Sequence, residues 1–243
     1  MSDWRRNPAI RAVVVGASGG IGAALAAALT GRGGLVHALA RRPLPEGAGW
    51  LPGIVDITDE TSIAAAFAAL EGGPPLDLVL VATGLLHDGA IRPEKSLRAL
   101  DPANLARAFA VNAIGPALVA KYALPLMPRR TRSVFAAISA RVGSIADNRL
   151  GGWYGYRASK AALNQLVRTT AVEAARTHPQ AIVAALHPGT VATGLSAPFR
   201  SGSDPATIVD AATAADNLLR VIDGLTPADT GGFFSWDGTR IPF

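Results

Sequence analysis

Short apolar runs and longer amphipathic segments alternate along the chain, and the two patterns predict strands and helices in turn. Mainly apolar runs predict strands at residues 11–15, 35–40, 50–55, 76–82, 133–138, 181–186 and 232–235. Apolar residues at helical spacing predict helices at about 20–30, 58–70, 102–126, 152–177 and 208–222. Gly115 and Pro116 are expected to disturb the third of these helices.

This alternation favours a parallel sheet with right-handed crossovers and helices on both faces. We expect a doubly wound α/β fold, Rossmann-like, with about seven strands and residues 232–235 at an edge. No second core, repeat or linker is visible, so residues 1–243 are expected to form one domain. Ligands of such sheets bind beyond the carboxyl ends of the strands. Six residues of interest fall within two positions after predicted strands: Gly16, Arg41, Asp56, Gly84, Ser139 and Pro188.

The composition excludes several classes of function. The chain has 243 residues, 49% of them hydrophobic and 17% charged, which suits a sheet buried on both faces. It has no cysteine, and its four histidines are scattered without metal-ligand spacing, so we expect neither a disulfide nor a metal site. The net charge is +5, but the arginines are dispersed, which argues against nucleic acid as a partner. Residues 1–8 carry no apolar run of signal-peptide length and no run reaches a membrane span, so we expect a cytoplasmic protein without a membrane partner.

Tyr156 and Lys160 stand four residues apart at the start of the helix predicted over 152–177. Residues at this spacing share one face of a helix, so the pair places an ammonium beside a phenol. A nearby cation favours the phenolate, and we expect it to lower the pKa of Tyr156 toward neutrality, where the phenol can act as a general acid or base. An ordinary surface pair is the alternative interpretation.

A glycine-rich turn joins the first predicted strand to the first predicted helix. Such glycines let backbone amides approach a pyrophosphate at a helix N-terminus. The residues of the turn are Gly16, Ser18, Gly19, Gly20, Ile21 and Gly22. Together with Tyr156 and Lys160, this turn resembles the short-chain dehydrogenase/reductase family over nearly the whole chain.

The resemblance implies hydride transfer between a nicotinamide cofactor and a small-molecule carbonyl or alcohol. It implies that Tyr156 is the proton donor, that Lys160 also binds the nicotinamide ribose, and that Asn112 stabilises a helix irregularity and holds a water next to the lysine. The family's serine stands three residues before the glycine that matches Gly143, and that position here is Ala140. The catalytic hydroxyl is therefore expected from Ser139 or Ser144, or Tyr156 polarises the carbonyl alone.

Two arginines, Arg41 and Arg42, follow the second predicted strand, where a preference for NAD would require an acid. They can hold a 2′-phosphate, so we expect NADP(H), with NAD(H) as the alternative cofactor. A solvated basic loop is the other interpretation of these arginines. The resemblance places Asp56 and Ile57 at the adenine edge, although Asp56 could instead cap a turn. It places Gly84 beside the ribose.

The segment after the sixth predicted strand resembles the family's Pro-Gly turn. The resemblance implies that Pro188, Gly189, Val191 and Thr193 fix the nicotinamide carboxamide, while His187 is interpreted as a packed residue at the strand end. Residues 194–208 are expected to form an apolar substrate lid that includes Leu195.

Several runs narrow the resemblance to a branch with C-factor-type signalling proteins and sniffer-type carbonyl reductases. These runs are Gly84-Leu85-Leu86-His87-Asp88, Pro93-Glu94-Lys95-Ser96-Leu97, Ser139-Ala140-Arg141-Val142-Gly143-Ser144-Ile145 and Gly151-Gly152-Trp153-Tyr154. The main hypothesis is an NADPH-dependent carbonyl reductase, and the alternative is a cofactor-binding signalling protein with little turnover. The alanine-rich helices at 102–126 and 152–177 can pack between copies, which predicts a homodimer or homotetramer.

Overall fold

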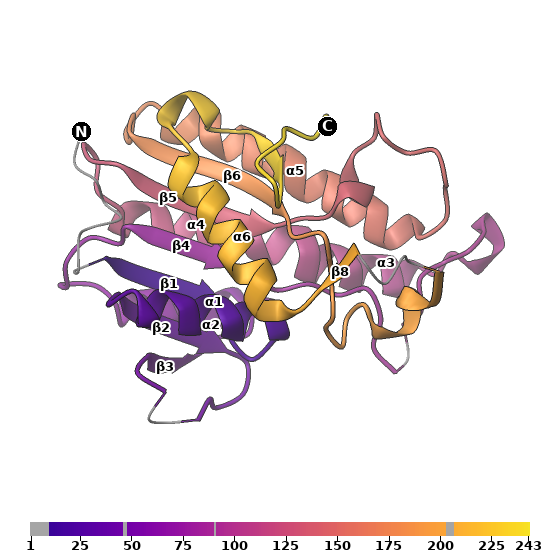
Figure 1. Cartoon of the computed structure of the whole chain (residues 1–243), viewed down its shortest axis with the longest axis horizontal. Helices are drawn as coiled ribbons and strands as arrows, with labels where there is room; N and C mark the ends of the chain where they lie inside the picture. Colours follow the sequence, from indigo (N-terminus) through magenta and orange to yellow (C-terminus); the bar gives the residue numbers. More distant parts are fainter. Residues whose placement is uncertain (1–9, 46–47, 90, 203–206) are drawn as a thin grey trace.

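The computed structural model describes residues 10–45, 48–89, 91–202 and 207–243. Expectations about residues 1–8 and about lid residues 203–206 lie outside the described residues. Within these ranges, seven strands form one parallel sheet in the order β3-β2-β1-β4-β5-β6-β9 (Figure 1). The strands are β1 (Arg11–Val15), β2 (Leu35–Ala40), β3 (Leu51–Ile54), β4 (Leu78–Val81), β5 (Ser133–Ile138), β6 (Ala181–His187) and β9 (Phe233–Ser235). The predicted doubly wound fold is confirmed, including β9 at an edge.

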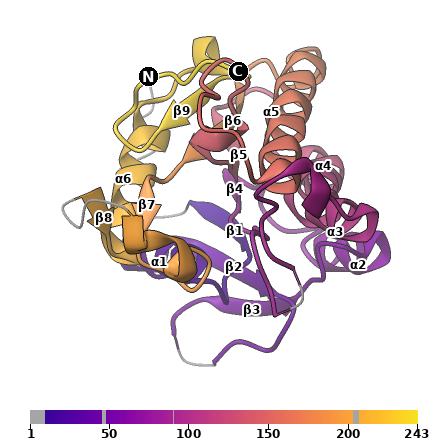
Figure 2. The same cartoon turned by 90° about the vertical axis from the view of Figure 1, so that its right-hand side faces the viewer.

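Helices cover both faces of the sheet (Figure 2). One face carries α1 (Gly20–Gly31) and α6 (Ala211–Gly224), which pack against each other. The other carries α2 (Glu60–Ala68), α3 (Pro102–Phe109), α4 (Gly115–Ala123) and α5 (Tyr154–Ala174). Alternate strand residues feed the two cores: Val13 packs with α5 and its neighbours, whereas Val14 packs with α1 and α6.

Strand β1 lies between β2 and β4, so the chain leaves β1 toward one face and enters β4 from the other. This reversal opens a crevice at the carboxyl ends of β1 and β4, where a ligand can enter. Gly16 turns the chain at this point with φ +91°, and a Cβ there would lie 2.9 Å from Thr83 Cγ2. A glycine is therefore required at the floor of the crevice.

The long helix predicted over residues 102–126 is interrupted, as expected, but slightly earlier than Gly115. Residues Ala110–Ile114 form a π-helix between α3 and α4, which is a single widened turn. By length and composition alone, Pro102–Leu126 could cross a membrane, with a mean hydropathy of 1.3. In the structure this segment packs against α2 and α5, as core helices of globular proteins do.

A second sheet, of two short strands, was not predicted from the sequence. Strand β7 (Thr190–Val191) pairs with β8 (Ile208–Val209), so the helix expected from residue 208 begins only at Ala211, after its cap Asp210. This pairing brings residues 190–191 and 208–209 side by side in a separate two-stranded sheet.

Candidate active site

Two adjoining cavities lie at the carboxyl ends of the strands. The first, of about 250 Å³, is here called the Tyr156 cavity; it is bordered by Ser139, Tyr156, Lys160, His187, Thr193 and Leu195, among others. The second, of about 320 Å³, is called the Arg41 cavity; it is bordered by Gly16, Ser18, Gly19, Arg41, Asp56 and Ile57, among others. Ala82, Thr83 and Gly84 border both. Most of the predicted site residues thus border one of these two adjoining cavities; those that do not are Gly20, Gly22, Arg42, Asn112 and Ser144.

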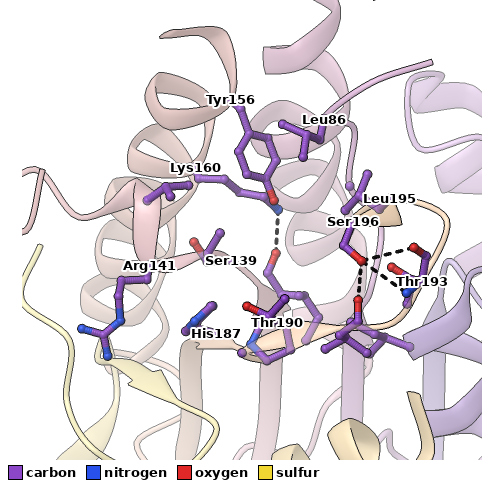
Figure 3. A pocket seen from close by; sticks show the side chains of 18 of the residues that line it. Leu86, Ser139, Arg141, Tyr156, Lys160, His187, Thr190, Thr193, Leu195 and Ser196 are labelled. Atoms are coloured by element: carbon purple, nitrogen blue, oxygen red, sulfur yellow. Dashed lines mark hydrogen bonds between the residues drawn. The ribbon is translucent and has the colours of Figure 1, made fainter. Parts of the chain in front are cut away.

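Tyr156 and Lys160 project from the first two turns of α5 into the Tyr156 cavity (Figure 3). The Lys160 ammonium lies 5.9 Å from the centre of the Tyr156 ring. The Lys160 side chain is buried, and its Nζ donates a 2.7 Å hydrogen bond to the Ile138 carbonyl at the end of β5. The helical spacing therefore brings the pair together, and β5 fixes the position of the lysine.

The pKa values of this pair move in the opposite direction from the one we expected. Burial lowers the pKa of Lys160 to about 7 and raises the pKa of Tyr156 to about 12. The expectation that the lysine lowers the tyrosine pKa is wrong here, because burial disfavours the charged form of both groups. Tyr156 is consequently a protonated phenol at neutral pH, which is the form that can donate a proton.

Asn112 lies within the π-helix and is fully buried. Its Oδ1 accepts a hydrogen bond from Leu85 N at 2.7 Å, and its Nδ2 donates to Leu85 O at 2.8 Å and to Ser159 Oγ at 3.0 Å. A Cβ on Gly84 would lie 3.8 Å from Lys160 Nζ and 3.9 Å from Asn112 Oδ1. Asn112 therefore ties the segment after β4 to α5, next to the lysine.

The start of α1 fits a dinucleotide. Gly19 N donates to Gly16 O, and no side chain caps the first turn of the helix, so its amides are free to bind an anion. A Cβ on Gly22 would lie only 2.2 Å from Gly16 O, and one on Gly20 would lie 2.8 Å from Thr193 Cγ2. These glycines let the turn fold tightly.

The crevice beside this turn also holds a polar atom without a protein partner. Thr83 Oγ1 is buried and hydrogen-bonds no other group in the part of the chain that the structure describes. A buried hydroxyl in this position suits a polar ligand in the crevice.

Arg41 and Arg42 differ in their positions. Both are exposed, but only Arg41 borders the cavity that bears its name. Asp56 borders it too, and its Oδ1 accepts hydrogen bonds from Thr58 N at 2.9 Å and Thr58 Oγ1 at 2.7 Å. These bonds, with the charge of Arg41, lower the pKa of Asp56. Asp56 therefore closes a turn, as the alternative interpretation held, and also faces the cavity.

The chain matches a family model described as short chain dehydrogenase over residues 11–204. The chain belongs to the short-chain dehydrogenase family. C-signal of Myxococcus xanthus is 39% identical over 145 residues, which cover 59% of this chain and 81% of that protein. A 1-hydroxy-2-glutathionyl-2-methyl-3-butene dehydrogenase of Rhodococcus sp. (strain AD45) is 32% identical over 188 residues, 77% of each chain.

A similar solved structure is the NADPH-bound carbonyl reductase from chicken fatty liver. It has a TM-score of 0.83 and 25% identity, and the match covers 96% of this chain and 94% of that chain. The expected resemblance is confirmed, including its branch. The dehydrogenase is a nicotinamide-dependent oxidoreductase that acts on a small-molecule carbonyl or alcohol.

The two candidate serines of the dehydrogenase occupy different places. Ser139 borders the Tyr156 cavity, but its hydroxyl donates its only proton to Asn164 Oδ1 at 2.7 Å. Asn164 Nδ2 donates to Gly143 O, which fixes the orientation of the amide. Ser144 borders a separate hollow, where its Oγ accepts from Asp147 N. The structure thus excludes Ser144 from the Tyr156 cavity and does not favour Ser139 as a donor to substrate.

The start of α5 depends on a residue that the sequence analysis did not single out. Glu94 is buried and accepts a 3.0 Å hydrogen bond from Gly155 N, 61 positions away, while its carbonyl accepts from Trp153 N. Trp153 adopts φ +51°, a left-handed conformation that is uncommon for a non-glycine residue. Glu94 thereby caps the helix that carries Tyr156.

The segment after β6 forms the opposite wall of the Tyr156 cavity. Pro188, Gly189, Val191, Thr193 and Leu195 border it, and their predicted contacts with nicotinamide and substrate stay predictions. Ile21, from the glycine-rich turn, also borders it.

Aromatic contacts hold this wall. Phe199 lies edge-on to Trp153 and His87, with ring centres 5.2 Å and 5.4 Å away. Trp153 in turn lies edge-on to Tyr156 at 6.3 Å. The described part of the expected lid therefore rests on the element that carries the tyrosine.

His187 also faces this cavity, which the sequence analysis missed. Its Nδ1 is buried and has no hydrogen-bond partner among the described residues. Burial lowers the pKa of His187 to about 4; the charge of Arg141 adds to this effect, and Asp237 opposes it. The ring is neutral at neutral pH.

Proposed function

We propose that the dehydrogenase reduces the carbonyl group of a mainly apolar small molecule with NADPH. The observation that carries this proposal is the protonated Tyr156 phenol, which faces an apolar cavity that adjoins the glycine-rich anion site. Leu86, Ile138, Val142 and Phe199 supply much of the apolar lining. When bound, the reduced nicotinamide would supply the hydride.

In this proposal Tyr156 gives its proton to the oxygen of the reacting carbonyl. Lys160, held by Ile138 O, binds the ribose and keeps a polar group beside the phenol. Asn112 positions the chain around Gly84 against α5 and the lysine, and its predicted contact with a water stays part of the proposal. Ser139 holds the cavity wall through Asn164.

The remaining binding roles follow from the positions of the residues. Gly16, Ser18, Gly19, Gly20 and Gly22 would hold the pyrophosphate at the start of α1. Asp56 and Ile57 would border the adenosine, and Ile21, Pro188, Gly189, Val191 and Thr193 would border the nicotinamide end. Leu195 would contact the substrate.

The test of the reaction is NADPH oxidation by purified protein against a panel of aldehydes, ketones and quinones, with NADH beside it. Tyr156→Phe is expected to lower kcat by at least about 100-fold, the usual contribution of a general acid, while NADPH still binds. Tyr154→Phe is the matched control, because Tyr154 lies two residues earlier and borders a different hollow. Retained turnover in Tyr156→Phe would remove the tyrosine from the proton-donating role.

Preference for NADPH over NADH rests on Arg41 and on the absence of an acid at the end of β2. The chicken relative that binds NADPH supports the same choice. Arg41→Ala is expected to weaken NADPH about tenfold or more and to leave NADH within about threefold, because only NADPH carries the 2′-phosphate. Arg42→Ala serves as control, and equal losses for both cofactors in Arg41→Ala would refute the phosphate contact.

Two observations keep the signalling alternative in view: Ala140 replaces the family's serine, and C-signal is among the relatives. Tight NADPH binding without turnover of any compound in the panel would support this alternative.

Four expectations stay predictions: the homodimer or homotetramer, the cytoplasmic location, the single domain over 1–243 and the lid at 194–208. Light scattering after size-exclusion chromatography would measure the oligomeric state.

A further inference from the structure

The Tyr156 cavity has fewer free hydrogen-bond donors than its lining suggests. Ala140 has no hydroxyl, the Ser139 proton is donated to Asn164, and Ser196 Oγ donates to Val191 O. Lys160 Nζ donates one proton to Ile138 O and is assigned above to the ribose. A substrate held by Tyr156 alone would be fixed at one point, and a second contact from another residue of the lining would orient it.

His187 stands where a second contact can form. Along β6, Ala185 packs into the core on the α5 side of the sheet and Leu186 into the core on the other side. Because side chains alternate along a strand, His187 shares the face of α5, which carries Tyr156. Figure 3 shows the His187 ring apart from the Tyr156 hydroxyl, so the two side chains approach the cavity at different places.

The His187 ring borders the cavity, and its Nδ1 makes no hydrogen bond among the described residues. A buried polar atom without a hydrogen bond costs about 1–3 kcal/mol, and such atoms are uncommon in native structures. The charged groups that bear on the ring are Arg141 and Asp237, which act on it in opposite directions, and the ring stays neutral. A neutral imidazole has one donor and one acceptor nitrogen, so it can bind a hydroxyl or a carbonyl.

We propose that the His187 ring hydrogen-bonds a second oxygen of the substrate, away from the carbonyl that Tyr156 protonates. This inference rests on the proposed reductase function and adds a specificity-determining residue to it. It assigns the enzyme to carbonyl compounds that carry a further hydroxyl or carbonyl group. Thr83 and Thr190 also border the cavity and carry hydroxyls, so the test must separate His187 from both.

The test compares substrates with and without the second oxygen: cyclohexanone against 2-hydroxycyclohexanone and 4-hydroxycyclohexanone. His187→Leu is expected to lower kcat/KM for the better hydroxyketone about tenfold and to leave cyclohexanone within about threefold. His187→Asn, which keeps an amide near the position of Nδ1, is expected to recover part of the loss. Comparing the ratio of the two kcat/KM values between wild type and variant cancels the difference in intrinsic reactivity of the two substrates.

His178→Leu is the matched control. His178 also has a buried ring nitrogen without a partner among the described residues, but it lies at the turn between α5 and β6 and does not border the Tyr156 cavity. The His178→Leu variant should leave the ratio of kcat/KM for the hydroxyketone to kcat/KM for cyclohexanone unchanged. Thermal unfolding and the NADPH dissociation constant, measured for each variant, show whether the fold and the cofactor site are intact.

Two results would overturn the inference: an unchanged ratio in His187→Leu, including equal losses on both substrates, or a loss of the ratio in Thr190→Val or Thr83→Val alone. A weakened NADPH complex with an unchanged ratio would assign His187 to the cofactor instead. Binding of the same compounds to the NADPH-loaded protein, measured by calorimetry, separates this inference from the reductase proposal. Selective binding without turnover would refute reduction but support His187, and binding without selectivity would refute His187 alone.

Discussion

Burying Lys160 has a cost in stability that depends on pH, and replacing it by methionine should remove that cost. Burial lowers the pKa of this lysine to about 7 in the folded protein, against 10.5 for the ordinary side chain. Between these two values the unfolded chain binds a proton that the folded protein does not. The free energy of unfolding of the wild type should therefore rise with pH in this range, whereas the Lys160→Met variant lacks the effect.

The size of the effect follows from the two pKa values. One pKa unit corresponds to about 1.4 kcal/mol, and integration between pH 7 and pH 9 gives a rise of about 2 kcal/mol. Loss of the hydrogen bond to Ile138 O subtracts about 1 kcal/mol from the variant at every pH in this range. The free energy of unfolding of the wild type, minus that of the variant, should thus increase as pH rises.

The measurement is urea unfolding of both proteins without cofactor at several pH values from 6 to 9. Burial raises the pKa of Tyr156 to about 12, so this group does not titrate in the range used. Lys121→Met is the control, because Lys121 is an exposed lysine whose pKa is raised by its ion pair with Glu60. The difference in the free energy of unfolding between wild type and Lys121→Met should therefore not change with pH from 6 to 9. If the free energy of unfolding of the wild type minus that of Lys160→Met stays constant or falls as pH rises, the assignment of a buried lysine with a lowered pKa is refuted.

Three further substitutions test the surroundings of the site. Gly22→Ala should abolish NADPH binding, measured by fluorescence titration, because its Cβ would meet Gly16 O at 2.2 Å, whereas Gly31→Ala in the same helix meets nothing within 4 Å and should keep it; equal behaviour of the two would contradict the tight turn. Glu94→Gln should lower the free energy of unfolding by about 1–2 kcal/mol and reduce kcat, since the buried carboxylate caps the helix that carries Tyr156, the proposed proton donor; an unchanged kcat would show that the cap does not position Tyr156. Ser139→Ala should reduce kcat/KM only a few-fold, because its proton is already donated within the protein, and a loss above about 100-fold would restore the serine to direct contact with substrate.

The sequence was sufficient to predict the sheet and the proximity of Tyr156 and Lys160. Strands such as 11–15 and 133–138 are apolar runs bounded by turn residues, and the structure has them at the predicted residues. Tyr156 and Lys160 come together because their spacing is fixed by the helix itself. The disturbance expected near Gly115 was also found, as the π-helix that holds Asn112.

What the sequence could not supply depends on tertiary packing. The pKa of Tyr156 moves upward because of burial, and residue spacing contains no information on burial. The contact of Glu94 with Gly155 joins segments 61 positions apart, and nothing local marks it. The exclusion of Ser144 follows from the course of the chain after β5, which the alternation of a strand does not predict.

Trp153 is an intrinsic fluorescence probe of the Tyr156 cavity, because it lies in the row of rings that runs from His87 through Phe199 to Tyr156. The chain has four tryptophans, and within the described residues Trp153 is the one that borders the Tyr156 cavity. Its emission should therefore be quenched by energy transfer when NADPH binds, and should respond again when a substrate enters or the Phe199 segment shifts. A Trp153→Phe protein supplies the background signal, so the order of cofactor and substrate binding can be timed by stopped-flow fluorescence without an attached dye.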